Sequence, residues 1–473
     1  MLFNSLPFLI FLPIVFLCYW LLSNKYRWLV LLIASYYFYS GWGIWYAVLL
    51  LSTTVIDFFM ALKITGSKTV SGRKLFLLIS LSCNLFVLLS FKYSIFLFNS
   101  GVYIANHFSG HEYNFLKQII IPVGLSFYTF QSIAYTVDVY RGEVIPEKNL
   151  VQFALFVSFF PQLVAGPVER FNHLMPQLKR KAVFTFEMLF PAIRIAVWGF
   201  FKKMVIADRL AEIVDPVFKN VSSFSGSTLL TAGFLFVVQV YCDFSGYTDI
   251  ATGIAKLFGV DLVLNWRRPL LSKSLIEFWK RNHISVTSWF RNYLYIPLGG
   301  NKVSYQRWLF NIFLVFLISG LWHGANWTFV IWGAMHGLVY IIELIIKKRF
   351  PNSRFPFGFG HIYLLLFHTV SLIAFRAQSV GDLGIIYHRI FTSFDLNLLS
   401  AELVHVKDAF PLVIDLGLIL FLFLKEIQEE FAFINAENNF YTRFLKPAFY
   451  ICLFIGIFLS GNFNCNRFIY FRF

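Results

Sequence analysis

The sequence contains very little charge. Only 14% of its 473 residues are Asp, Glu, Lys or Arg, whereas 58% are hydrophobic, and the mean hydropathy is +0.68. Because an ordinary soluble domain carries about 25% charged residues, this composition excludes that class. It predicts an all-α polytopic integral membrane protein, since a helix satisfies its own backbone hydrogen bonds within lipid.

Several patterns that would indicate other functions are also missing. The five cysteines are scattered, without a CxxC pair or a spacing to histidine typical of a metal site. We therefore predict no disulfide, no bound metal and no bound cofactor. The sequence has no P-loop, Rossmann glycine motif or serine nucleophile elbow. It also shows no soluble domain, low-complexity linker or internal repeat, so we predict one domain over residues 1–473.

Basic residues are concentrated in the short connections between apolar runs. The net charge of +16 therefore indicates cytoplasmic loops beside anionic lipid and not a nucleic-acid partner. The amino terminus lacks the cationic region and cleavage site of a secretory signal, so the first apolar run is expected to remain as a transmembrane helix. Lys25 and Arg27 follow this run, which predicts that residue 1 lies outside. The apolar runs predict about eleven transmembrane helices plus re-entrant or interfacial helices.

Three stretches differ from the pattern of a straight span. Residues 28–62 are interrupted by two glycines, which predicts two short crossings joined by a turn. Residues 159–170 contain two prolines and a glycine, which predicts a re-entrant or kinked element. Residues 119–139 are apolar but hold many polar side chains, so this helix is expected to face the protein interior. Interhelical hydrogen bonds and substrate contact explain these polar residues equally well.

The most informative stretch is 277–337. Between Trp308 and Ile342 there is no Lys, Arg, Asp or Glu, yet the run contains His323 and His336. A titratable side chain at membrane depth is costly and therefore indicates a functional site.

The residues around His323 favour a break in the helix. Gly320, Gly324 and Asn326 lie close to it, and irregular backbone at this depth is tolerated only where it is buried in protein or lines a cavity. We therefore expect His323 to face an internal chamber. The alternative is a neutral histidine that hydrogen-bonds between helices as a structural element.

Two further groups of polar residues accompany this stretch. Residues 276–294 have the periodicity of an amphipathic interfacial helix with His283 on its apolar face, where a histidine is more often a core residue than a catalyst. Asp243 and Asp249 lie within an apolar region that also contains Tyr247. They form either ion pairs with a nearby arginine or a polar wall of the chamber.

A buried neutral histidine can act as a general base that activates a hydroxyl group for attack on an acyl group. The residues are thus compatible with a histidine-dependent transferase. They are also compatible with a proton-coupled transporter, although a transporter predicts inverted repeats that are not visible.

Motif blocks along most of the chain resemble the membrane-bound O-acyltransferase superfamily. They resemble in particular its bacterial branch of alginate O-acetylation proteins, to which teichoic-acid D-alanylation proteins are related. The blocks are FPQLVAGPVER at 160–170, YCDFSGYTD at 241–249, EFWKRNHIS at 277–285, YLYIPLGG at 293–300, LWHG at 321–324 and FIYF at 468–471. They occur in the order found in that family.

The resemblance implies a fold with a central tunnel, catalysis by His323 and a second functional histidine at His283. His336 belongs to a pattern common in this branch and is expected to be structural. Candidate tunnel or substrate contacts are Asn326, Trp322, Asp243, Tyr247 and Glu169. Asn326, Tyr247 and the amides near Gly324 are also candidates for stabilising the oxyanion.

The resemblance also implies the substrates and the location. The expected location is a bacterial inner membrane, and the expected donor is an acyl thioester at the cytoplasmic face, acetyl-coenzyme A or an acyl carrier. The expected acceptor is a hydroxyl group of a cell-envelope polysaccharide, or an extracytoplasmic SGNH-type or carrier partner protein. The alternative is transfer of D-alanine or another acyl group to teichoic acid or peptidoglycan.

Overall fold

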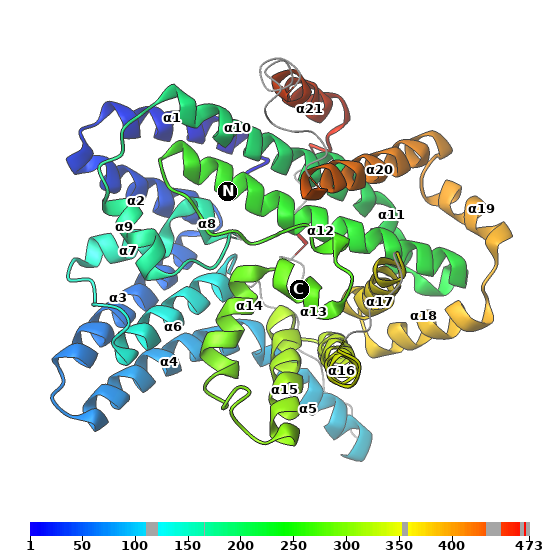
Figure 1. Cartoon of the computed structure of the whole chain (residues 1–473), viewed down its shortest axis with the longest axis horizontal. Coiled ribbons are helices and arrows are strands. Elements are labelled where there is room, and N and C mark those ends of the chain that lie inside the picture. The colour runs from blue at the N-terminus through cyan, green and yellow to red at the C-terminus, as the bar shows by residue number, and fades with distance from the viewer. Residues whose placement is uncertain (110–121, 165, 352–357, 432–445, 464–467, 470–473) are drawn as a thin grey trace. The chain divides into compact units, whose positions relative to one another are not determined.

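The structure, a computed structural model (Figure 1), describes residues 1–109, 122–164, 166–351, 358–431, 446–463 and 468–469. These residues form helices and connections, with no strand among them, which confirms the all-α class. They divide into two compact units, Met1–Ile193 with Ala251–Val263, and Arg194–Ile250 with Leu264–Phe473. The single domain expected from the sequence stays a prediction.

Five described helices are long and apolar enough to cross a membrane. They are α3 (Ile44–Gly66), α4 (Val70–Lys92), α12 (Gly226–Leu257), α16 (Trp327–Arg349) and α17 (Phe359–Arg376). Shorter apolar helices include α1 (Leu6–Leu21), α19 (Leu396–Val406) and most of α21 (Lys446–Ser460). The protein is therefore a multi-pass membrane protein, whereas the count of about eleven spans stays a prediction.

The first unit begins with four helices in sequence. A turn separates α2 (Asn24–Ser40) from α3, and Gly43 in this turn has a φ of 144°, a backbone region that glycine enters without steric cost. The expected interruption of residues 28–62 is therefore present. The other helices of this unit are α5 (Ser94–Ser109), α6 (Leu125–Arg141), α7 (Leu150–Ser158), α8 (Phe160–Leu163) and α9 (Phe171–Lys179).

Helix α6 is buried almost throughout, as its polar residues predicted. Several of these side chains make interhelical hydrogen bonds. Gln131 donates to the carbonyl oxygen of Phe156 at 2.9 Å, and the hydroxyl oxygens of Thr136 and of Ser80 on α4 lie 3.2 Å apart. Ser80 also donates to the buried carboxylate of Asp57 at 2.6 Å. Hydrogen bonding between helices therefore accounts for Gln131 and Thr136. Residues 119–121 of the expected helix lie outside the described residues.

The stretch 159–170 is not a straight span, as the prolines predicted. Helix α7 ends at Ser158, the four-residue α8 follows, and residues 166–170 are irregular; residue 165 lies outside the described residues. Glu169 closes this stretch and is fully buried. Its carboxylate accepts a hydrogen bond from the Val263 amide at 2.6 Å and lies 2.7 Å from Nδ1 of His173. Burial raises the pKa of Glu169. Through its contact with Val263, Glu169 links the end of the stretch 159–170 to the segment that follows α12.

The second unit starts within α10 (Phe186–Phe200), which continues as the π-helix η1 (Phe201–Ala207) and as α11 (Asp208–Lys219). The two consecutive lysines of η1 are buried against α12. Lys202 lies 2.7 Å from Asp249, and Lys203 lies 2.5 Å from Asp243. Of the two alternatives for these aspartates, the structure shows ion pairs, and their partners are lysines and not an arginine.

Five short helices lie before and after the spanning helix α12 of this unit. They are η2 (Val221–Ser223), η3 (Pro269–Leu271), α13 (Leu275–Arg281), α14 (Ile284–Phe290) and the π-helix η4 (Arg291–Tyr295). They lead into α15 (Tyr305–His323) and α16, which pack side by side in Figure 1. Beyond α17 follow α18 (Val380–Thr392), α19, α20 (Ala409–Phe431) and α21.

Glycines allow α15 and α16 to approach closely. A Cβ atom on Gly320 of α15 would lie 2.3 Å from the carbonyl oxygen of Phe329, and one on Gly333 of α16 would lie 2.5 Å from that of Phe316. Real Cβ atoms do not come so near to backbone atoms. The two glycines therefore fix the separation of the helices that flank His323.

We expect Gly320→Ala to destabilise the protein by about 1–3 kcal/mol, because the added methyl group must push the two backbones apart. The measurement is thermal unfolding of the purified protein in detergent. Gly417→Ala is the matched control, since a Cβ atom at Gly417 of α20 meets nothing within 4 Å. An unchanged unfolding temperature for Gly320→Ala would contradict the close packing described here.

Candidate functional site

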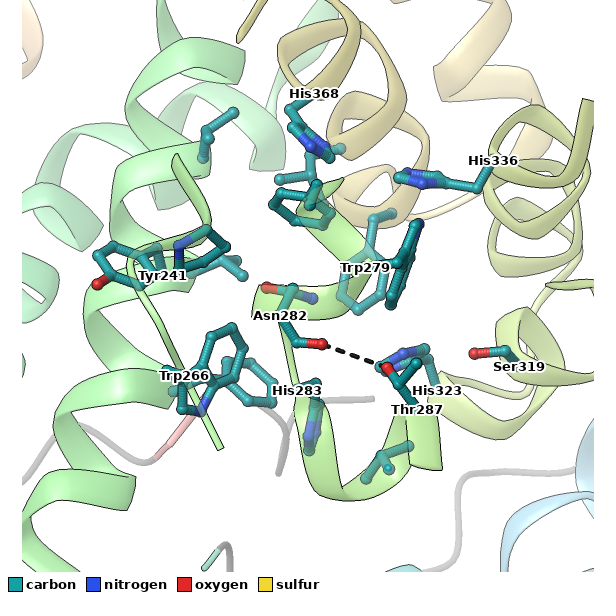
Figure 2. A pocket seen from close by; sticks show the side chains of 18 of the residues that line it. Tyr241, Trp266, Trp279, Asn282, His283, Thr287, Ser319, His323, His336 and His368 are labelled. Atoms are coloured by element: carbon teal, nitrogen blue, oxygen red, sulfur yellow. Dashed lines mark hydrogen bonds between the residues drawn. The ribbon is translucent and has the colours of Figure 1, made fainter. Parts of the chain in front are cut away.

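A cavity lies within the second unit, and its volume is about 80 Å3. The helices α12 to α17 and the segment that precedes α13 contribute its walls, and Figure 2 shows several of these side chains. Most lining residues are apolar or aromatic. Its histidines are His283, His323, His336 and His368.

His323 is the last residue of α15. The helix ends there because Gly324 has an extended backbone and α16 begins only at Trp327. The break expected from the glycines is therefore present. His323 is 8% exposed, and the centroid of its ring lies 5.2 Å from that of Trp332 and 5.4 Å from that of Phe375. The helix end thus places the imidazole in the cavity wall, among aromatic rings.

His283 lies at a second break. The continuous helix expected over 276–294 is wrong: α13 ends at Arg281, α14 begins at Ile284, and the last turn is the π-helix η4. His283 has a φ of 49°, a conformation that non-glycine residues seldom adopt and that clusters at functional sites. The periodicity of the sequence was correct for each short helix, but it did not reveal the break between them.

Asn265 holds this break in place. Its side-chain oxygen accepts hydrogen bonds from the amide and the hydroxyl group of Ser285 at 3.1 and 2.8 Å, and it lies 3.4 Å from Nδ1 of His283. Its carbonyl oxygen accepts from the Ile284 amide at 2.9 Å. The Trp266 ring packs against the imidazole with centroids 5.3 Å apart. These contacts fix the direction of the His283 side chain.

We expect Asn265→Ala to lower activity about tenfold or more, because small displacements of a positioned group reduce rates strongly. The protein should remain folded, since the change removes one side chain without creating a clash. The measurement is product formation at equal protein amounts, together with thermal unfolding. Full activity of Asn265→Ala would show that the position of His283 does not matter.

Burial lowers the pKa of His283 to about 3. The residue lies between two short helices and outside the spanning helices. Because this value is far below neutral pH, the imidazole is uncharged at pH 7, and one of its ring nitrogens carries a lone pair instead of a proton.

His336 and His368 complete the set of histidines. Nε2 of His336 on α16 lies 3.2 Å from the hydroxyl oxygen of Ser371 on α17, and the ring centroids of His336 and His368 are 5.6 Å apart. Sequence reasoning did not single out His368. The available signal was a histidine inside the apolar run that forms α17, the same signal that identified His323.

The remaining residues expected at the site do not line the cavity. Asn326 caps α16: its side-chain oxygen accepts from the Thr328 amide at 3.1 Å, and its nitrogen donates to the Gln378 carbonyl oxygen at 2.8 Å. Trp322 is buried behind the histidines, with its ring 4.9 Å from that of His323 and 6.3 Å from that of His283. It therefore supports both imidazoles.

Asp243 and Tyr247 contact residues 468 and 469. Asp243 accepts a hydrogen bond from the Ile469 amide at 2.8 Å, in addition to its ion pair. The Tyr247 ring lies 5.2 Å from that of Phe468. Tyr470 and Phe471 of this sequence block lie outside the described residues. Glu169 belongs to the other compact unit.

The described part of the chain contains no group of three or more His, Cys, Asp or Glu residues that could hold a metal ion. The four described cysteines are not joined in disulfides, and Cys465 lies outside the described residues.

Comparisons with known proteins agree with the motif blocks. The sequence model of the membrane-bound O-acyltransferase family matches residues 143–381. The chain is 35% identical to the probable alginate O-acetylase AlgI of Pseudomonas putida, over 100% of both chains. It is 35% identical to the peptidoglycan O-acetyltransferase of Helicobacter pylori, over 80% of this chain and 78% of the relative. It is 28% identical to the teichoic acid D-alanyltransferase of Streptococcus thermophilus, over 51% of this chain and 61% of the relative.

Proposed function

Because the chain belongs to the membrane-bound O-acyltransferase family, we propose that it transfers acetyl groups to hydroxyl groups of a cell-envelope polysaccharide. The observation that carries this proposal is similarity over the full length to a probable alginate O-acetylase, together with a cavity that His323 lines. The peptidoglycan O-acetyltransferase relative supports the same reaction type.

In this proposal His323 is the general base. The hydroxyl group of the acceptor gives its proton to the His323 imidazole as its oxygen attacks the acyl carbon of the thioester. The aromatic walls around His323 exclude water, which protects the thioester from hydrolysis and strengthens polar interactions with the reacting atoms. His283 is the second functional histidine, and its neutral imidazole accepts a hydrogen bond from a substrate group or a water molecule.

The composition of the cavity wall supports acetyl over D-alanyl transfer. A D-alanyl group carries an ammonium ion, and an ion buried without a counter-charge is strongly disfavoured. None of the described residues that line the cavity is Asp or Glu. An acetyl group is uncharged and small, and it requires no counter-charge in the cavity.

The donor, partner and location form part of the same proposal. The donor is acetyl-coenzyme A or an acyl carrier thioester that arrives from the cytoplasmic face of the inner membrane, and residue 1 lies outside. An extracytoplasmic SGNH-type or carrier protein receives the acetyl group or delivers it to the polysaccharide. The many basic residues of the chain favour an anionic donor at the cytoplasmic side.

The test is the ester content of the cell envelope in a deletion strain with and without a plasmid copy of the gene. Mild alkali releases ester-linked acetate and D-alanine, and both are quantified from fractionated polysaccharides. We expect the plasmid to restore acetate and to leave D-alanine unchanged. If the plasmid restores ester-linked D-alanine alone, the protein is a D-alanyltransferase and not an acetyltransferase. If neither ester changes, acyl transfer to the envelope is refuted.

A further inference from the structure

One side of the cavity contains an unusual number of unpaired ring nitrogens. Nε1 of Trp279 and Trp332, Nδ1 of His336 and Nε2 of His368 have no hydrogen-bond partner among the described residues, and all four atoms are shielded from solvent. All four residues line the cavity. A buried polar group without a partner costs about 1–3 kcal/mol, so such a concentration calls for an explanation.

A bound group that supplies acceptors would satisfy the two indole N–H groups. An indole nitrogen can only donate a hydrogen bond, so the two tryptophans require an acceptor and cannot be satisfied by a donor. The aromatic side chains around them contain no oxygen that serves this purpose. The carbonyl oxygen of an acyl group is an acceptor of the right kind.

Among the indoles that line the cavity, Trp332 lies closest to the proposed base; the Trp322 ring is nearer to His323, at 4.9 Å, but does not line the cavity. The ring centroid of Trp332 lies 5.2 Å from that of His323, with the ring planes 83° apart, and the side chain is 4% exposed. The Trp279 ring lies 6.1 Å from Trp332 and 5.5 Å from His336. An acyl carbon that reacts beside His323 therefore has Trp332 as its neighbouring donor.

We propose that the indole N–H of Trp332 binds the carbonyl oxygen of the acyl thioester and stabilises the oxyanion that forms on it. This inference rests on the proposed acetyl transfer. The acceptor oxygen forms a bond with the acyl carbon, His323 takes the hydroxyl proton, and the electron pair of the C=O double bond moves to the oxygen beside Trp332. When this pair returns, the C–S bond breaks, and the thiolate receives the proton from His323. The products are the acetate ester and a free thiol.

Two other candidates for this role are occupied elsewhere. Both polar atoms of the Asn326 side chain are used at the start of α16, as described above. Trp266 also lines the cavity, but its indole N–H already donates to Thr248 at 3.2 Å. Trp332 combines proximity to His323 with an N–H group that has no protein acceptor.

The test compares the rate of ester-linked acetate formation in the deletion strain that carries either wild type or Trp332→Phe. Phenylalanine keeps an aromatic ring in the cavity wall and removes the N–H group. Loss of one oxyanion donor lowers rates by about 10²–10³, so we expect a decrease of about 100-fold at equal amounts in the membrane. Trp308→Phe is the matched control, because the Trp308 indole donates to Tyr295 at 2.8 Å and does not line the cavity. It should retain the wild-type rate.

A second variant separates the N–H group from the shape of the side chain. Replacement of Trp332 by 3-benzothienylalanine through codon suppression substitutes sulfur for the N–H group within a ring system of nearly equal size. We expect the same loss as for Trp332→Phe, with an unfolding temperature equal to that of wild type. A wild-type rate with the benzothienyl side chain overturns the role of Trp332. Absence of acetate ester with the wild-type protein refutes the proposed function itself, so the two failures are distinguishable.

Discussion

The His323→Ala variant is expected to lose acetyl transfer almost completely. Removal of a positioned general base lowers rates by about 10²–10⁴. The His323 side chain is only 8% exposed, so bulk solvent is not expected to take its place. The measurement is ester-linked acetate in the deletion strain, with the amount of each variant in the membrane determined by immunoblotting.

A surface histidine provides the control for this experiment. His405 of α19 is exposed and does not line the cavity, so His405→Ala should support wild-type acetylation. Purified His323→Ala should also unfold at nearly the wild-type temperature, because its neighbours are aromatic rings that retain most of their contacts. Full acetylation by a folded His323→Ala variant would show that His323 has a structural role.

Lys203→Met is expected to destabilise the protein by about 3–5 kcal/mol, the usual cost of removing one partner from a buried ion cluster. Lys203 is 3% exposed and lies 2.7 Å from Asp208 and 2.5 Å from Asp243. Without the ammonium group two buried carboxylates face each other without a counter-charge. The measurement is thermal unfolding in detergent, together with the yield of folded protein.

An exposed ion pair serves as the reference for this prediction. Lys256 and Asp261 also form an ion pair, but their side chains are 33% and 65% exposed. Exposed pairs contribute about 0–1 kcal/mol, so Lys256→Met should have little effect. Equal unfolding temperatures for Lys203→Met and wild type would contradict the charged state assigned to the cluster.

The buried cluster also connects two distant parts of the sequence. The second oxygen of Asp243 accepts from the amide of Ile469, and the ring of Phe468 lies 4.6 Å from that of Phe244. Lys203 compensates the charge of Asp243, and Asp243 in turn binds the amide of Ile469. The ion pair therefore also helps to hold the end of the described chain against α12. The Lys203→Met variant should accordingly show faster proteolytic removal of the carboxyl terminus than wild type.

The sequence by itself determined the class of the protein and its most prominent residue. An uncharged run that is long enough to span the membrane must be buried in lipid or protein. A histidine within such a run is costly and therefore indicates a functional site. The glycines beside His323 predicted the end of the helix, because glycine weakens a helix and favours a break in it. Both properties are local, and for this reason they can be read from neighbouring residues.

Which side chains contact each other could be learned only from the tertiary structure. The sequence did not reveal that Asp243 pairs with Lys203, which is 40 residues away, or that Asn265 holds the break at His283. It also did not show that His368 of α17 and Trp332 of α16 line the same cavity. These relations arise from packing between helices that are distant in the chain, and the periodicity of a single segment contains no information about which side chain of another segment it will meet.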